Sequence, residues 1–130
     1  MGRIYDDAEQ FESLFTRMFD EIADHDGMAT LVDQQMLIRF RLHDPDVDLW
    51  IDGRASPVTT SFTALDLEPT LVADLSTDSM HELLLGTLPL GRALLFRKLK
   101  VQGSKSKAMK LEPLLHAMQS VYPDLAADLR

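Results

Sequence analysis

The sequence predicts an α+β fold, and three features of the 130-residue chain support this prediction. Residues 6–24 carry apolar side chains at helical spacing. Residues 36–42 and 47–51 instead alternate between apolar and polar side chains, which is typical of half-buried strands. Residues 96–111 combine both patterns, because they predict a strand, a tight turn and the start of a helix.

Residues 96–111 are the unit around which the rest of the chain is predicted to be organised. Leu99 and Val101 alternate with polar residues, and Gly103 then ends the strand. Ser104 is a suitable N-cap for the helix that follows. Because Gly103 joins a strand directly to a helix, we expect its backbone to need a positive φ or close packing.

The segment LLLGTLPLGRALLFRKLKVQGSKSKAMKL, residues 83–111, resembles the C-terminal half of the sterol carrier protein type 2 family, as a stand-alone prokaryotic-type domain. The resemblance lies in the order of its elements: Gly86, Phe96, Lys98-Leu99-Lys100-Val101, Gly103 and Ala108-Met109-Lys110-Leu111. In order of elements it covers roughly residues 35–118. It implies a five-stranded, largely antiparallel sheet with helices packed on one face. It also implies a hydrophobic tunnel between sheet and helices that holds a lipid.

The chain length predicts a single domain, residues 1–130. Residues 1–34 form an N-terminal helix and connector, residues 35–118 the sheet-helix core, and residues 119–130 a tail. Within the core we expect a hairpin at 36–52 and strands at 58–62, 71–75 and 98–102. We also expect a helix capped by Ser76 or Thr77 and ended by Gly86, a helical turn at 92–96 and a last helix. Pro113 predicts a kink in that last helix, or a second helix with Pro113 at its first position.

The helix at residues 6–24 has an apolar stripe that could be core or a lipid contact, and core is the favoured interpretation. Asp6 and Glu9 resemble a capping box at its start. Gly27 is a plausible C-terminal stop, and residues 28–34 are then a connector. The stripe consists of Phe11, Leu14, Phe15, Met18, Phe19 and Ile22.

The net charge of −8 is unevenly distributed. Residues 1–82 carry eighteen acidic and five basic residues, whereas residues 83–111 carry seven basic residues and no acidic one. The overall acidity argues against nonspecific nucleic-acid binding, which needs a basic face. The basic segment could meet an anionic membrane surface or a lipid carboxylate, although the favoured interpretation is a solvated surface that balances the acidic half.

The residues do not indicate catalysis, a metal site or a bound cofactor. The chain has no Cys, and its four His residues stand in separate elements without ligand spacing. Asp44, Asp46 and Asp48 resemble the start of a calcium loop, but Leu49 and Ala55 occupy the positions where that loop needs Gly and Glu. The start resembles no secretory signal, and the end is no peroxisomal signal, so a cytoplasmic protein is expected.

The predicted function is noncatalytic binding or transfer of an apolar lipid, such as a fatty acyl chain or a sterol. Trp50 stands on the polar face of its predicted strand, where its indole would be exposed to solvent unless another group covers it. Alternatives are a structural or oligomerisation module and an accessory that presents a lipid-linked substrate to a partner enzyme. The protein is expected to be a monomer or a homodimer. The predicted basic rim is Lys98, Lys100, Lys105 and Lys107. The predicted cavity lining is Phe40, Trp50, Phe62, Leu84, Leu94, Leu95, Phe96, Met109, Leu114, Leu115 and Met118.

Overall fold

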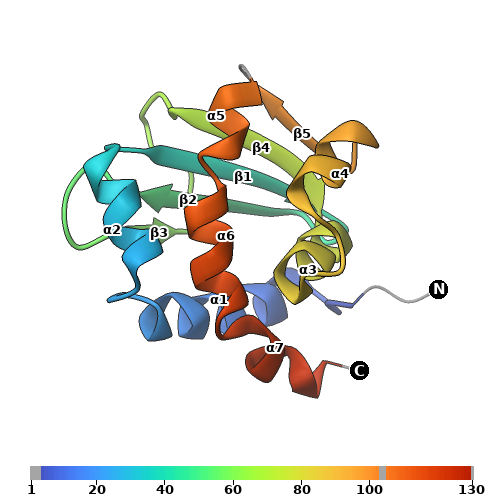
Figure 1. Cartoon of the computed structure of the whole chain (residues 1–130). Helices are drawn as coiled ribbons and strands as arrows, with labels where there is room; N and C mark the ends of the chain where they lie inside the picture. Colours follow the sequence, from blue (N-terminus) through green and yellow to red (C-terminus); the bar gives the residue numbers. More distant parts are fainter. Residues whose placement is uncertain (1–3, 103–104, 130) are drawn as a thin grey trace.

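A five-stranded sheet forms the centre of the computed structural model, which describes residues 4–102 and 105–129 (Figure 1). The strand order is β3-β2-β1-β4-β5. The side chains of Lys105 and Lys107 lie outside the described part, as do Gly103 and Ser104, on which the predicted turn and N-cap fall. The strands are β1 (Leu37–His43), β2 (Val47–Asp52), β3 (Thr59–Ser61), β4 (Leu71–Ser76) and β5 (Leu99–Gln102).

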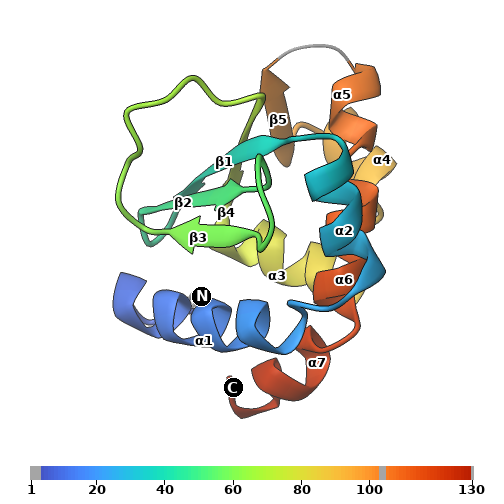
Figure 2. The same ribbon diagram turned by 90° about the vertical axis from the view of Figure 1, so that its left-hand side faces the viewer.

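The pairing of the strands confirms the predicted largely antiparallel sheet. β1, β2 and β3 form an antiparallel meander, and β4 then pairs with the other side of β1 in parallel. A parallel neighbour cannot be reached through a tight turn, so the chain crosses back through the long loop that follows β3. Figure 2 shows this loop on the side of the sheet away from most of the helices. β5 pairs antiparallel with β4.

The helices α2, α4, α5 and α6 lie on one face of the sheet, whereas α1 runs below it near β3 (Figures 1 and 2). This arrangement agrees with the helical layer that was expected. The helices are α1 (Ala8–Glu21), α2 (Asp26–Asp33), α3 (Thr77–Leu85), α4 (Leu90–Leu95), α5 (Lys105–Met109), α6 (Glu112–Gln119) and α7 (Tyr122–Leu125), followed by the 3-10 helix η1 (Ala126–Asp128).

The apolar stripe of α1 is core, as favoured from the sequence. Phe11 and Phe15 are fully buried and stack with their ring centroids 3.9 Å apart. The predicted capping box was wrong by one residue: Asp7 rather than Asp6 is the N-cap and accepts from the Gln10 amide. The Gln10 side chain in turn accepts from the Asp6 amide at 2.7 Å, so Gln10 takes the part expected of Glu9.

The predicted connector at residues 28–34 was also wrong, because α2 occupies this stretch. Gly27 does not stop a helix but lies in the first turn of α2. A Cβ at Gly27 would meet the carbonyl oxygen of Pro113, at the start of α6. The glycine is therefore explained by the close approach of two helices, a reason that the local sequence does not reveal.

Pro113 separates the last predicted helix into two, which was one of the two expected outcomes. α5 ends at Met109, and α6 begins at Glu112 with Pro113 as its second residue rather than its first.

Ser76 caps α3 and Gly86 ends it with a φ of 81°, both as predicted. The helical turn expected at residues 92–96 starts earlier, since α4 begins at Leu90 and includes Gly91.

Candidate functional site

The face of the sheet that meets the helices is a continuous apolar wall. Its residues alternate along β1, β2 and β4 with the polar residues of the opposite face. One row crosses four strands, because Leu49 pairs with Phe40, Phe40 with Ala73, and Ala73 with Val101. Ala73 has the smallest side chain of this row, so the apolar side chains reach least far from the sheet next to the ring of Phe40.

The helices supply a second apolar wall opposite the sheet. α3 contributes Leu83 and Leu84, and α6 contributes Leu114, Leu115 and Met118, all no more than 4% exposed. These residues belong to the same buried cluster as the strand residues. Figure 1 shows α6 crossing in front of the sheet, with α4 beside it. The two walls therefore meet in a closely packed layer between sheet and helices.

Part of the predicted cavity lining comes together in this layer. Phe40 comes from the sheet, and Leu84, Leu114, Leu115 and Met118 come from the helices. Two further residues, Leu94 and Phe62, are partly buried against the same cluster.

Four other predicted lining residues lie elsewhere. Leu95 and Phe96 are 74% and 63% exposed, and Met109 is 44% exposed. Trp50 is buried, but its β2 neighbours Leu49 and Ile51 face the helices, so it lies on the opposite face of the sheet. The structure thus divides the predicted lining among the layer, the surface and the far side of the sheet.

A pocket of about 240 Å³ opens onto the apolar layer between α6 and the segment that joins α3 to α4. Leu115 forms part of its wall, and the Gln119 side chain donates to the Leu83 carbonyl at 2.9 Å near its edge. Most of its lining was missed from the sequence, because residues from two separated segments, 83–90 and 112–119, meet here. The lining is Leu83, Gly86, Leu88, Pro89, Leu90, Glu112, Leu115, His116 and Gln119.

The far face of the sheet carries charged residues around Trp50. The Arg39 guanidinium donates to both carboxylate oxygens of Asp48, at 2.9 and 3.0 Å, and lies 5.1 Å from the Trp50 ring centroid. The hydrogen bond to Asp48 raises the pKa of Arg39. This arrangement covers the indole, although its Nε1 has no hydrogen-bond partner among the described residues. Trp50 thus makes a cation–π contact with Arg39 on the far face of the sheet.

His81 of α3 belongs to a chain of three hydrogen-bonded side chains. Its Nδ1 lies 2.7 Å from the Tyr122 hydroxyl, which lies 2.6 Å from the hydroxyl of Tyr5. Burial lowers the pKa of His81 and raises the pKa of both tyrosines. His81 is half-buried and joins α3 to α7.

Groups of three or more side chains suited to hold a metal ion do not occur among residues 4–102 and 105–129. In the same part of the chain, every helix is too short or too polar to cross a membrane. Arg39 is paired with Asp48, and His81 is hydrogen-bonded to Tyr122. What the geometry offers instead is an apolar layer with an adjoining pocket.

The sequence profile of the SCP-2 sterol transfer family matches residues 15–116, which include the sheet and most of its helical cover. The chain belongs to the SCP-2 sterol transfer family. The match spans the second half of α1, the whole sheet and the first part of α6. It confirms the resemblance that residues 83–111 carry. No curated protein has a sequence that matches this one.

Solved structures share the fold at low sequence identity. Sterol carrier protein domain 2 of Helicoverpa armigera is 18% identical with a TM-score of 0.66, and the match covers 92% of this chain and 95% of that one. Apo sterol carrier protein 2 of Yarrowia lipolytica is 21% identical with a TM-score of 0.62, over 78% and 89% of the two chains. A ubiquinone synthesis protein, UbiJ-SCP2, is 13% identical with a TM-score of 0.62, over 83% and 98%. At these identities the likeness establishes the fold.

Proposed function

We propose that this SCP-2 family member binds and transfers an apolar lipid, a fatty acyl chain or a sterol-like molecule, without catalysing a reaction. The observation that carries the proposal is the apolar layer in which the sheet and α6 bury their facing walls. Family membership supports it. Removing apolar ligand surface from water contributes about 25 cal/mol per Å², so a chain held in this layer needs few polar contacts.

The proposed lining is the predicted set that meets in this layer: Phe40, Phe62, Leu84, Leu94, Leu114, Leu115 and Met118. The adjoining pocket of about 240 Å³ is the proposed mouth. Ligand sites of drug-sized molecules are usually about 300–1,000 Å³, so a long chain needs more room than this pocket offers. We therefore propose that α6 moves away from α3 when a ligand enters, breaking the hydrogen bond from Gln119 to Leu83.

A titration with fluorescent fatty acyl and sterol probes tests this proposal. The wild-type chain should bind at least one probe saturably. Leu115→Trp places a larger side chain in the proposed mouth and should weaken binding by about tenfold, a loss of about 1.4 kcal/mol. The matched control is Leu14→Trp, because Leu14 is similarly buried but lines a different pocket beside α1.

Two results would count against the proposal. If no probe binds saturably, the proposed function is contradicted. Equal weakening of probe binding by Leu14→Trp and Leu115→Trp would contradict the proposed position of the mouth, because the effect would then result from general damage to the core.

A second candidate is an accessory that presents a lipid-linked substrate to a partner enzyme. Its specific support is the fold shared with the ubiquinone synthesis protein UbiJ-SCP2. Both candidates need lipid binding, whereas a purely structural or oligomerisation module does not. Gel filtration with and without detergent separates monomer from homodimer and tests that last alternative. The cytoplasm is the proposed location, which cell fractionation would test.

A further inference from the structure

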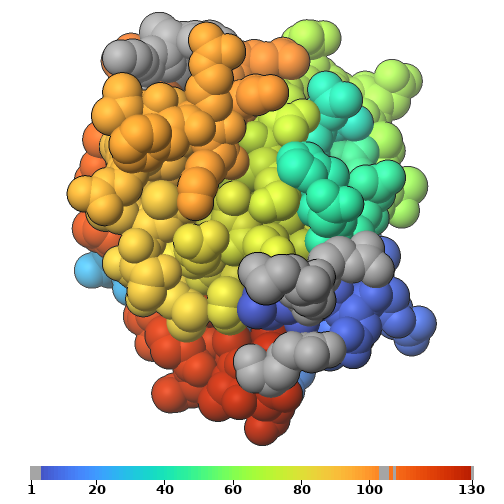
Figure 3. Space-filling view, turned by 90° about the vertical axis from the view of Figure 1, so that its right-hand side faces the viewer, coloured from blue at the N-terminus to red at the C-terminus, as the bar shows by residue number. Residues whose placement is uncertain are grey.

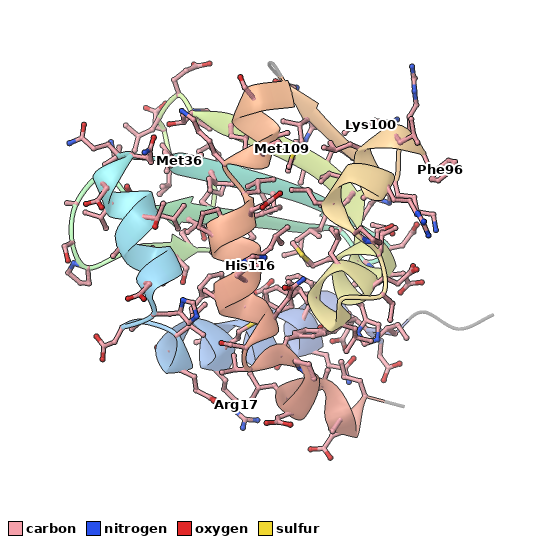
Figure 4. All side chains as sticks on the ribbon, in the orientation of Figure 1. Arg17, Met36, Phe96, Lys100, Met109 and His116 are labelled. Carbon is pink, nitrogen blue, oxygen red and sulfur yellow. The ribbon has the colours of Figure 1, made fainter. Side chains whose placement is uncertain are left out.

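The end of α4 exposes two adjacent apolar side chains. Leu95 and Phe96 are 74% and 63% exposed, the highest values among the large apolar side chains of the described residues. In α4, Leu90 and Ala93 are buried and Leu94 packs partly buried against the core, so Leu95 and Phe96 fall outside the core-facing stripe. Figure 4 shows Phe96 pointing away from the protein.

These two side chains stand on a fixed corner rather than a loose loop. The amide of Lys98 donates to the Ala93 carbonyl at 2.9 Å, and the amide of Arg97 donates to the Leu94 carbonyl at 3.3 Å. This pair of bonds is the Schellman arrangement that closes a helix C-terminus. These bonds fix the backbone of residues 93–98, so the exposed Leu95 and Phe96 stand on an ordered helix end.

Arg97 occupies the position of this motif where glycine is usual. Its φ is 58°, in the left-handed region that a residue with a Cβ adopts at a cost. A glycine here would fit the backbone without that cost. An arginine at such a position motivates the hypothesis that its side chain has a function.

The cations around the corner complement an anionic surface. Arg92, Arg97 and Lys98 are exposed, and none of the three makes an ion pair within the described residues. They belong to residues 83–111, which carry seven basic residues and no acidic one in a chain of net charge −8. Figure 3 views the side of the molecule on which α4 and β5 lie, with their residues covering its upper left.

We propose that this corner docks the protein on an anionic lipid membrane, with Leu95 and Phe96 entering the interface and Arg92, Arg97 and Lys98 facing the headgroups. Apolar residues flanked by cations are the combination that binds such interfaces. Two apolar side chains are far fewer than the 20–30 residues that each side of a stable protein interface uses. The docking is therefore weak and reversible, as a carrier that must leave the membrane requires.

This inference deepens the proposed lipid transfer, but its test needs no transferred lipid. Binding is measured by flotation with vesicles of phosphatidylcholine alone and of phosphatidylcholine mixed with phosphatidylglycerol. The wild-type chain should bind the mixed vesicles more tightly, and high salt should reduce the difference because it screens exposed charges. Combined Leu95→Ser and Phe96→Ser should weaken binding by about tenfold or more.

The charge variants separate docking from folding. Arg97→Gly should raise the melting temperature, because glycine suits the positive φ, and yet weaken vesicle binding by about fivefold. Arg97→Glu should weaken binding further. The matched controls are Arg17→Glu on α1, which Figure 4 shows at the opposite end of the molecule from Phe96, and Leu67→Ser, a 42% exposed leucine in the loop after β3. Both should bind the vesicles as the wild type does.

Three results would overturn the docking surface. The first is equal wild-type binding to neutral and mixed vesicles. The second is an equal loss in Arg17→Glu and Arg97→Glu. The third is wild-type self-association that Leu95→Ser with Phe96→Ser abolishes while vesicle binding persists, because the corner would then join two copies. If the chain binds the vesicles but takes up no lipid probe, the docking surface is supported and the proposed lipid transfer is contradicted.

Discussion

The hydroxyl of Tyr5 lies 2.6 Å from the hydroxyl of Tyr122, although 117 positions separate the two residues in the sequence. Both side chains are fully buried. The contact ties the segment before α1 to the start of α7, and the further bond from Tyr122 to His81 extends it to α3. Three parts of the chain are thus joined below the sheet by buried polar groups, each of which has a partner.

Tyr122→Phe should destabilise the protein more than Tyr5→Phe. Loss of the Tyr5 hydroxyl removes one bond and should cost about 1 kcal/mol, whereas loss of the central Tyr122 hydroxyl leaves both neighbours unpaired and should cost about 2 kcal/mol. Chemical denaturation of the two single variants and the double variant measures this. The double variant should be less destabilised than the sum of the two. Simple additivity would mean that the three groups are not coupled.

The lowered pKa of His81 predicts a loss of stability in acid. Burial is the main cause of the shift, and the carboxylates of Asp78 and Glu82 act in the opposite direction. Since the unfolded state then binds the proton more readily, the contribution is fully present above the ordinary pKa of about 6.5 and is lost as the pH falls through and below that value. Denaturation midpoints across this range should fall less steeply for His81→Gln. Identical slopes for variant and wild type would show that His81 contributes nothing to the acid sensitivity.

Gly27→Ala should destabilise the protein, because its Cβ would meet the Pro113 carbonyl oxygen where α2 approaches α6. Overpacking of this kind typically costs about 1–3 kcal/mol. Gly91→Ala is the matched control, since a Cβ at Gly91 meets nothing within 4 Å. It should instead stabilise α4 by about 0.5–1 kcal/mol. Thermal melts of the two variants shifted in the same direction would contradict the proposed helix contact.

The sequence predicted the strands well because their burial alternates with a period that the residues display directly. The register of the hairpin follows from that alternation, as the pairing of Phe40 with Leu49 shows. Gly27 misled the prediction because its role depends on Pro113, far along the chain, and not on its neighbours. In the local sequence, a glycine that ends one helix looks the same as a glycine in the first turn of the next helix.

The candidate site was only partly predictable for the same reason. Leu114, Leu115 and Met118 follow a helical stripe, so their burial could be expected. Leu95 and Phe96 continue an apolar run, and their exposure results from the end of α4 and the positive φ at Arg97. The position of the pocket depends on how α6 approaches the α3–α4 connection, which no short sequence pattern reports.

Native mass spectrometry of the freshly purified protein tests the central claim of lipid binding most directly. The account predicts a species heavier than the bare chain by the mass of a bound lipid, which disappears on denaturation. After lipid removal, incubation with a fatty acid or a sterol should restore such a species. A bare chain before and after incubation, with every offered lipid, would contradict the account.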